Sequence, residues 1–196
     1  SEMCIRDRQD ADFRVMLEEM GDDIDAVSVV TPDHTHFPAA ILAMSMGKHA
    51  YVEKPLTYTY QEADLLMKAE KKYGVVTQMG NQGPTGPASH QFKTGVERGL
   101  CENVSKIQAW KTSSLWFMKE EERAKDYTAQ IPKPESLDWD LWLGPRSDRP
   151  YHATVHPFDW RGWYDFGCGM LGDWGAHIID YCLLYTSPSP RDSDQS

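Results

Sequence analysis

The stretch AVSVVTPDHTHFPAAILAMSMGKHAYVE, residues 26–53, places one helical segment between two short strand-like segments. The first segment, 26–31, is rich in β-branched residues, as buried parallel strands are. Residues 38–46 have helical spacing, with a proline near the first turn and Gly47 as a stop signal. Residues 50–53 then form a second short strand. This β-α-β order predicts two parallel strands joined by a helical crossover.

The flanking sequence continues the same alternation in both directions. Residues 10–20 carry apolar side chains at helical spacing, and residues 75–79 form a third short strand. Between the second and third strands, Thr59 and Glu62 have the spacing of a capping box, which opens a helix that runs to Tyr73. The resulting order α-β-α-β-α-β predicts an α/β fold with a doubly wound parallel sheet.

The loops that follow the predicted strands form a candidate site. Ligands of doubly wound sheets bind outside the carboxyl ends of the strands. Three polar or glycine-rich loops occupy that position, at residues 31–36, 53–55 and 80–83. We therefore expect these loops to line one crevice.

Composition restricts the class of protein. The chain has 196 residues, 40% of them hydrophobic and 26% charged, and a formal net charge of −10. The hydrophobic share is enough for a packed core. The acidic balance argues against a nucleic-acid partner, which would require clustered Lys and Arg. No run of about 18 apolar residues occurs, so the sequence predicts no membrane-spanning helix.

The two ends of the chain differ from its body. Residues 1–8 and 182–196 resemble a frayed terminus and a Ser/Pro-rich tail. However, SEMCIRD (1–7) and CLLYTSPSPRD (182–192) can be encoded on opposite strands of one DNA stretch, which resembles a transposase sequencing adapter. We therefore expect 1–8 and 182–196 to be non-native adapter translation, and residues 9–181 to be native.

The pattern changes after Gly83. The sequence predicts a hinge and then elements of a second domain. These are the hinge GPTGP at 83–87, a helix over 89–99, a strand over 104–112, a charged helix face at 119–125 and a helix over 171–181. Cys101 and Cys168 have no spacing typical of a metal site or a disulfide.

Three motifs stand out in the sequence: TPDHTHF at 31–37, EKPL at 53–56 and DFGCGMLGDWGAHIID at 165–180. Together they resemble the Gfo/Idh/MocA family of oxidoreductases. The resemblance implies a partial Rossmann domain at 9–85. It also implies the start of a C-terminal domain with a mostly antiparallel open sheet at 86–181. NAD or NADP is the implied cofactor, and a sugar or cyclitol the implied substrate. The implied parent is a bacterial homo-oligomer, a dimer or tetramer, without a nucleic-acid or membrane partner.

Part of the cofactor site of that family has no counterpart in the sequence. No G-x-G-x-x-G loop follows a predicted strand of the Rossmann part, and no acidic residue follows a second strand; these are the elements that hold the pyrophosphate and the adenosine ribose. We expect both elements to lie upstream of Gln9 in the parent protein. The chain is then a fragment, which we expect to be inactive by itself, and the choice between NAD and NADP stays open.

The resemblance assigns catalytic roles to three residues. Lys54 follows a predicted strand and would hydrogen-bond the reacting hydroxyl. Asp173 and His177 are four residues apart, which places them on one face of a helix. His177 would be the general base, because histidine exchanges protons near neutral pH. Asp173 would orient its ring and bind substrate.

The remaining site residues are assigned in two groups. Those implied to bind the cofactor are Thr31, Pro32, His34, His36, Glu53, Lys54, Pro55, Asn81 and Gln82. Those implied to bind substrate are Arg161, Trp163 and Asp165. No metal is expected, because His34 and His36 have no third ligand at a suitable spacing.

Two other functions remain open at this point. An NAD-dependent glycosidase that works by oxidation and elimination could use the same lysine, aspartate and histidine. A non-catalytic ligand sensor could share the scaffold, although an intact catalytic set argues against it. A cytoplasmic location is expected, and export to the periplasm remains possible because the N-terminus of the parent is missing.

Overall fold

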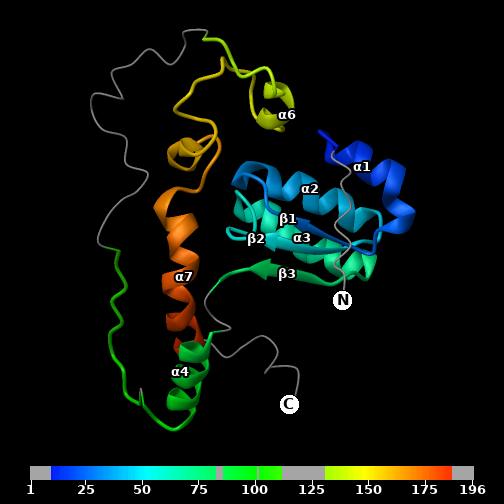
Figure 1. Ribbon diagram of the computed structural model, residues 1–196. Helices are drawn as coiled ribbons and strands as arrows, with labels where there is room; N and C mark the ends of the chain where they lie inside the picture. The colour runs from blue at the N-terminus through cyan, green and yellow to red at the C-terminus, as the bar shows by residue number, and fades with distance from the viewer. Residues whose placement is uncertain (1–9, 83–85, 101, 112–130, 187–196) are drawn as a thin grey trace.

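The computed structural model describes residues 10–82, 86–100, 102–111 and 131–186 (Figure 1). The first three residues of the predicted hinge, 83–85, lie outside the described residues, as does the predicted charged helix at 119–125. Along the described residues, no helix is both long enough and apolar enough to cross a lipid bilayer.

A parallel sheet of three strands organises the first half of the chain. The strands are β1 (Ala26–Val29), β2 (His49–Glu53) and β3 (Thr77–Gly80), in the spatial order β1-β2-β3. Val29 pairs with Val52, which in turn pairs with Met79. The predicted parallel sheet is confirmed, and its strands end at one common edge.

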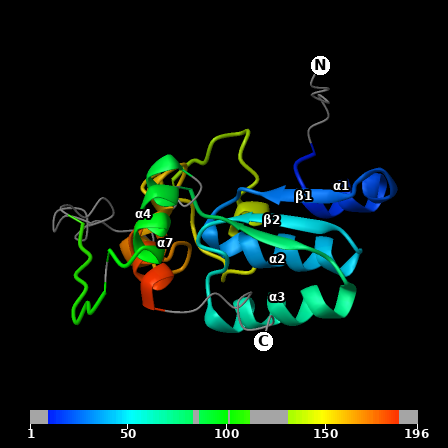
Figure 2. The ribbon, with the colours of Figure 1, turned by 90° about the horizontal axis from the view of Figure 1, so that it is seen from below.

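Helices α2 (Asp33–Ser45) and α3 (Tyr60–Tyr73) cover one face of this sheet (Figure 2). Alternate strand residues point toward these helices and are buried, as the period of two along a strand requires. The core they form comprises Val29, Ala39, Ala40, Met44, Ala50, Val52, Leu66, Ala69 and Val75. Tyr51, between two buried residues of β2, is 42% exposed on the other face.

Helix α2 begins at Asp33 and not at Pro38, where the sequence predicted its start. The residues interpreted as a turn form its first turn, because contacts with the distant α7 region hold them there. The backbone N–H of His34 donates to the carbonyl oxygen of Phe166 at 3.2 Å. The carboxylate of Asp33 accepts a hydrogen bond from the backbone N–H of Cys168 at 2.9 Å.

Two other helices begin at side-chain caps. Helix α1 (Phe13–Met20) starts after Asp12, whose carboxylate accepts from the backbone N–H of Arg14, and the short 3₁₀ turn η1 (Gly21–Asp23) follows it. The predicted capping box of α3 is confirmed. The Thr59 hydroxyl accepts from the Glu62 backbone N–H at 3.2 Å, and the Glu62 carboxylate accepts from the Thr59 backbone N–H at 2.8 Å.

We expect Thr59→Ala to lower the free energy of unfolding by about 1 kcal/mol, because it leaves an N–H at the start of α3 without its acceptor. Thr59→Ser keeps the hydroxyl and is expected to keep most of the stability. Urea unfolding of the two variants beside the parent sequence measures the difference. Equal losses in both variants would contradict a capping role for the hydroxyl.

The second half of the chain contains helices and an aromatic cluster. Its elements are α4 (Pro87–Glu97), α6 (Trp139–Leu143), the 3₁₀ helix η2 (Asp159–Gly162) and α7 (Gly169–Thr186). Helix α4 packs beside α7 (Figure 1). The buried members of the cluster are Trp139, Leu143, Val155, Trp160 and Phe166. The predicted helices at 89–99 and 171–181 are therefore present, and α7 continues past Tyr181.

The prediction of a strand over 104–112 is wrong for its described part, because residues 104–111 have no regular secondary structure. A strand forms only where a neighbouring strand supplies hydrogen-bond partners. Among the described residues, the sheet consists of β1, β2 and β3, which pair only with one another and not with this segment. The alternation of side chains was therefore not enough to specify a strand here.

Candidate active site

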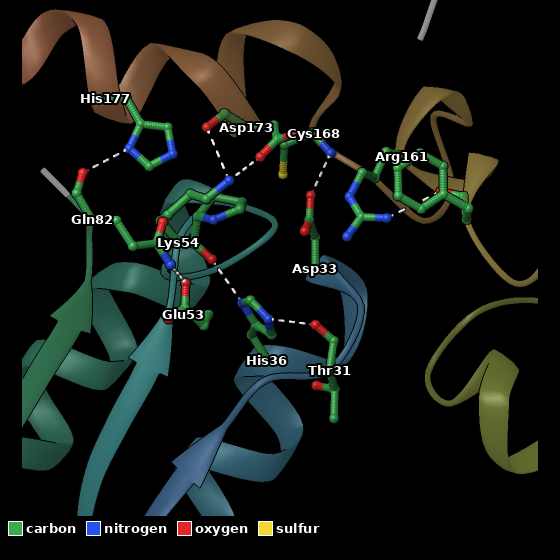
Figure 3. A network of polar contacts seen from close by, with 12 residues as sticks. Thr31, Asp33, His36, Glu53, Lys54, Gln82, Arg161, Cys168, Asp173 and His177 are labelled. Atoms are coloured by element: carbon green, nitrogen blue, oxygen red, sulfur yellow. Dashed lines mark hydrogen bonds and ion pairs between the residues drawn. The ribbon is translucent and has the colours of Figure 1, made fainter. Parts of the chain in front are cut away.

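The candidate active site lies where helix α7 crosses the carboxyl ends of β2 and β3 (Figure 3). Lys54 follows β2 directly, whereas Asp173 and His177 come from α7, more than a hundred residues later. Figure 3 shows the three side chains pointing toward one another. The structure therefore brings together the three residues that the sequence singled out for catalysis.

Lys54 and Asp173 form an ion pair across the two halves of the chain. The Lys54 ammonium donates to the Asp173 carboxylate, and its Nζ lies 3.3 Å from the Asp173 carbonyl oxygen. The two side chains are 15% and 13% exposed, respectively. A lysine held this way has its ammonium at a defined position at the carboxyl end of β2, with part of its surface still open to a ligand.

The sequence suggested that Asp173 orients the His177 ring. In the structure, a backbone carbonyl oxygen holds the ring instead. Its Nδ1 lies 3.0 Å from the carbonyl oxygen of Gln82, in the loop after β3. Because a carbonyl oxygen can only accept, Nδ1 must carry the hydrogen. In the neutral ring the lone pair is then on Nε2, the nitrogen that can accept a proton from a ligand.

The loop after β3 is fastened to α7 and to β2. The Asn81 amide nitrogen donates to the carbonyl oxygen of Ala176 at 3.1 Å, and the Gln82 amide nitrogen donates to the Glu53 carboxylate at 2.9 Å. Gly80 allows the Glu53 carboxylate to lie close to the end of β3, since a Cβ at Gly80 would be 2.7 Å from a Glu53 carboxylate oxygen. The predicted site residues Glu53, Asn81 and Gln82 thus form one connected group beside His177.

Asp33 is a residue of this region that sequence reasoning missed. It is 5% exposed, and its carboxylate accepts from the backbone N–H of Cys168, immediately before α7. Burial raises the pKa of Asp33, although the hydrogen bond from Cys168 opposes that shift. The sequence signal was an acidic residue directly after Thr31-Pro32, but only the fold shows its partner.

Cys168 itself is unsuited to nucleophilic chemistry. Burial, together with the nearby Asp33 carboxylate, raises the pKa of its thiol to about 12. The thiolate is the reactive form of cysteine, so this side chain is inert at neutral pH. Its position agrees with the interpretation of Cys168 as a small packed residue.

His34 and His36, predicted to bind the cofactor, are both buried. His36 is 1% exposed, and its two ring nitrogens lie 2.7 Å from the carbonyl oxygens of Pro55 and Thr31. It therefore joins the loops after β1 and β2. This placement argues against direct contact between its ring and a ligand.

His34 lies farther from the crevice, inside the aromatic cluster. It is 0% exposed and contacts the rings of Trp142 and Phe166. Its Nε2 lies 2.8 Å from the carbonyl oxygen of Trp142. Burial lowers the pKa of His34 to about 4, so the ring is neutral at physiological pH. The structure thus gives His34 a place in the core instead of at the crevice.

The structure does not join the predicted substrate residues to the Lys54 group. Trp163 packs against the aromatic cluster and donates its indole N–H to the Thr154 carbonyl oxygen at 3.3 Å. Asp165 forms an ion pair with Arg149 at 2.6 Å. Arg161 lines a separate cavity of about 440 Å³, whose wall also includes Tyr58, Thr59, Gly162, Tyr164, Gly167, Cys168 and Gly169.

The donor and acceptor groups at the crevice fit the nicotinamide half of a dinucleotide. Asn81 Oδ1 is buried and accepts no hydrogen bond from the described part of the chain, so it is available to an amide N–H. The Glu53 carboxylate is an acceptor suited to ribose hydroxyls. No three His, Cys, Asp or Glu side chains cluster as metal ligands within the described residues.

Comparison with protein families gives matches over both halves of the chain. Residues 5–81 match the model of the Gfo/Idh/MocA family described as an oxidoreductase NAD-binding Rossmann fold. Residues 86–190 match the model of the C-terminal α/β domain of the same oxidoreductase family.

Curated relatives and a solved structure agree with these matches. The chain is 37% identical to the scyllo-inositol 2-dehydrogenase (NADP(+)) of Bacillus subtilis, covering 91% of this chain and 40% of the relative. It is 38% identical to the scyllo-inositol 2-dehydrogenase (NAD(+)) of the same organism, covering 43% of this chain and 24% of the relative. An oxidoreductase domain protein from Kribbella flavida superimposes with a TM-score of 0.60 and 27% identity, covering 90% of this chain and 38% of that one.

The chain therefore spans at most 40% of the length of these three relatives. Within that span, the parallel sheet and the crossing helix α7 correspond to the two domains that the family models describe. Because residues 5–81 and 86–190 match the two domain models of this family, the chain belongs to the Gfo/Idh/MocA family of oxidoreductases.

Proposed function

We propose that the protein containing this sequence transfers a hydride between NAD or NADP and a ring carbon bearing a hydroxyl group, in a sugar or cyclitol. The observation that carries the proposal is the Lys54–Asp173 ion pair beside His177, at the carboxyl ends of parallel strands. The cofactors named for the B. subtilis relatives and their action on scyllo-inositol support this choice.

Oxidation of a secondary alcohol removes a hydride from carbon and a proton from oxygen. The Lys54 ammonium can donate a hydrogen bond to that oxygen, which stabilises the negative charge that develops as the proton leaves. His177 can receive the proton at Nε2, because Gln82 keeps the ring hydrogen on Nδ1. In the reverse direction the same two groups return the proton.

Asp173 acts on Lys54 in this scheme. Its carboxylate accepts a hydrogen bond from the ammonium and holds it in place. A fixed ammonium needs no reorganisation when charge develops on the substrate oxygen. Asp173 is therefore a positioning residue for Lys54, and a direct contact with substrate remains a further proposal.

The nicotinamide ring of NAD or NADP, when bound, supplies the hydride acceptor or donor. Residues that would hold this half of the cofactor are the backbone at Thr31 and Pro32, the Glu53 carboxylate and the amide of Asn81. The Gln82 amide nitrogen donates to the Glu53 carboxylate and so helps to fix its position.

The proposal is tested with the complete gene product that contains this sequence. The enzyme is incubated with NAD⁺ or NADP⁺ and a panel of cyclitols and sugars, and absorbance at about 340 nm reports reduced cofactor. We expect net reduction with at least one ring polyol. An aryl glycoside that releases its aglycone without net NADH would instead favour the glycosidase. Binding without either product would favour a sensor.

A further inference from the structure

Two further side chains, those of Trp174 and Lys111, lie beside His177. The Trp174 and His177 rings are in contact, with centroids 5.9 Å apart and planes inclined by 72°. The Lys111 ammonium lies over the Trp174 ring, 3.7 Å from its centroid. We propose that Trp174 and Lys111 are positioning residues for His177, an inference that rests on the proposed function.

His177 needs more than its hydrogen bond to act at a defined angle. A single N–H···O contact from Nδ1 to Gln82 fixes one corner of the ring, but it leaves the ring free to tilt about that contact. Trp174 is three residues earlier on α7, which puts both side chains on one face of the helix. Contact with the large indole ring restricts the tilt and so fixes the direction of Nε2.

The Trp174 ring is in turn held by a cation–π contact with Lys111. A cation over the face of an indole ring is attracted by the ring quadrupole, and tryptophan is the strongest such acceptor. Lys111 belongs to the segment 102–111, which has no regular secondary structure. Residues 102–110 are all exposed, and Lys111 is partly buried. Its contact with Trp174 therefore places this end of the segment against the catalytic helix.

The experiment uses the complete enzyme and compares four variants. Lys111→Met keeps the length of the side chain and removes its charge, whereas Lys111→Arg keeps a cation that can lie over the indole. Trp174→Leu removes the aromatic surface. Lys106→Met is the matched control, because Lys106 is an exposed lysine of the same segment. Thermal unfolding of each variant verifies that it is folded.

We expect Lys111→Met and Trp174→Leu to lower kcat about 10-fold, the range seen when the support of a catalytic group is lost, with KM for the cofactor changed less than about 2-fold. Lys111→Arg is expected to recover most of the loss, and Lys106→Met to behave as the parent enzyme. A kcat for Lys111→Met equal to that of Lys106→Met would overturn the role of Lys111.

A second measurement does not depend on activity. The ring protons of His177 are observed by NMR in the enzyme without cofactor and assigned with His177→Gln. We expect Trp174→Leu to remove a ring-current shift from these signals and Lys111→Met to reduce it. Unchanged signals in both variants would refute the positioning role. If instead the shifts change but His177→Gln is fully active, the packing is supported and the proposed function fails.

Discussion

Replacing His177 with alanine in the complete enzyme is expected to lower turnover about 10²–10⁴-fold, the usual contribution of a positioned general base. The expectation follows from the ring geometry, in which Nδ1 donates to the Gln82 carbonyl oxygen at 3.0 Å and Nε2 is left to take the proton. Affinity for the cofactor should hold, because the groups proposed to bind it are on other residues. Steady-state kinetics and cofactor titration measure the two effects separately.

His90 provides the matched control for this prediction. It is an exposed histidine on α4, outside the crevice, so His90→Ala should leave turnover unchanged. A turnover of His177→Ala similar to that of His90→Ala would refute the assignment of His177 as the base. A loss of cofactor affinity equal to the loss of turnover would show that the residue serves binding and not proton transfer.

Protonation of His34 is expected to destabilise the fold by roughly 3 kcal/mol between pH 6.5 and 4. In the unfolded chain the pKa of a histidine is near 6.5, whereas burial lowers the pKa of folded His34 to about 4. The folded state therefore favours the neutral ring. Its contribution to stability is complete above pH 6.5 and is lost as the pH falls toward 4, at about 1.4 kcal/mol per pH unit.

The surroundings of His34 explain why protonation of its ring is unfavourable in the folded state. His34 Nε2 already donates to the Trp142 carbonyl oxygen, and Nδ1 is buried with no hydrogen-bond partner among the described residues. A proton on Nδ1 would be a buried charge without an acceptor. Arg146 adds a positive charge nearby, which opposes protonation further.

Urea unfolding followed by tryptophan fluorescence at pH 7.5 and pH 4.5 tests this account. The parent sequence should lose much more stability between the two pH values than His34→Phe, in which nothing titrates at that position. His90→Gln removes an exposed histidine and should leave the pH dependence as it is in the parent. Identical pH dependence in the parent and His34→Phe would contradict the assignment.

Local signals in the sequence predicted much of the fold. The capping box of Thr59 and Glu62 needs only neighbouring residues, and α3 begins after it and runs to Tyr73 as predicted. The short β-branched segment at 26–31 predicted β1, because buried parallel strands have this composition. The meeting of Lys54 with the two α7 residues was implied by family motifs, and no local pattern could have produced it.

The errors arose where distant contacts decide the structure. Asp33 and His34 look like a turn after Pro32, yet contacts with Cys168 and Phe166 make them the first turn of α2. Distant contacts also determine where His34 and His36 lie. The family resemblance assigned both residues to the cofactor, and that assignment stays a prediction. The fold buries His34 among aromatic rings and places His36 between two carbonyl oxygens, and no local pattern in the sequence indicates either position.

The central claim is hydride transfer at the Lys54, Asp173 and His177 site, and isotope transfer tests it most directly. The complete enzyme is given NAD⁺ or NADP⁺ with a cyclitol or sugar deuterated at its ring carbons, and mass spectrometry of the reduced cofactor follows. The account predicts that deuterium appears in the nicotinamide ring, and that His177→Ala slows its appearance about 10²–10⁴-fold. Reduced cofactor without deuterium, or no reduction by any member of the panel, would contradict it.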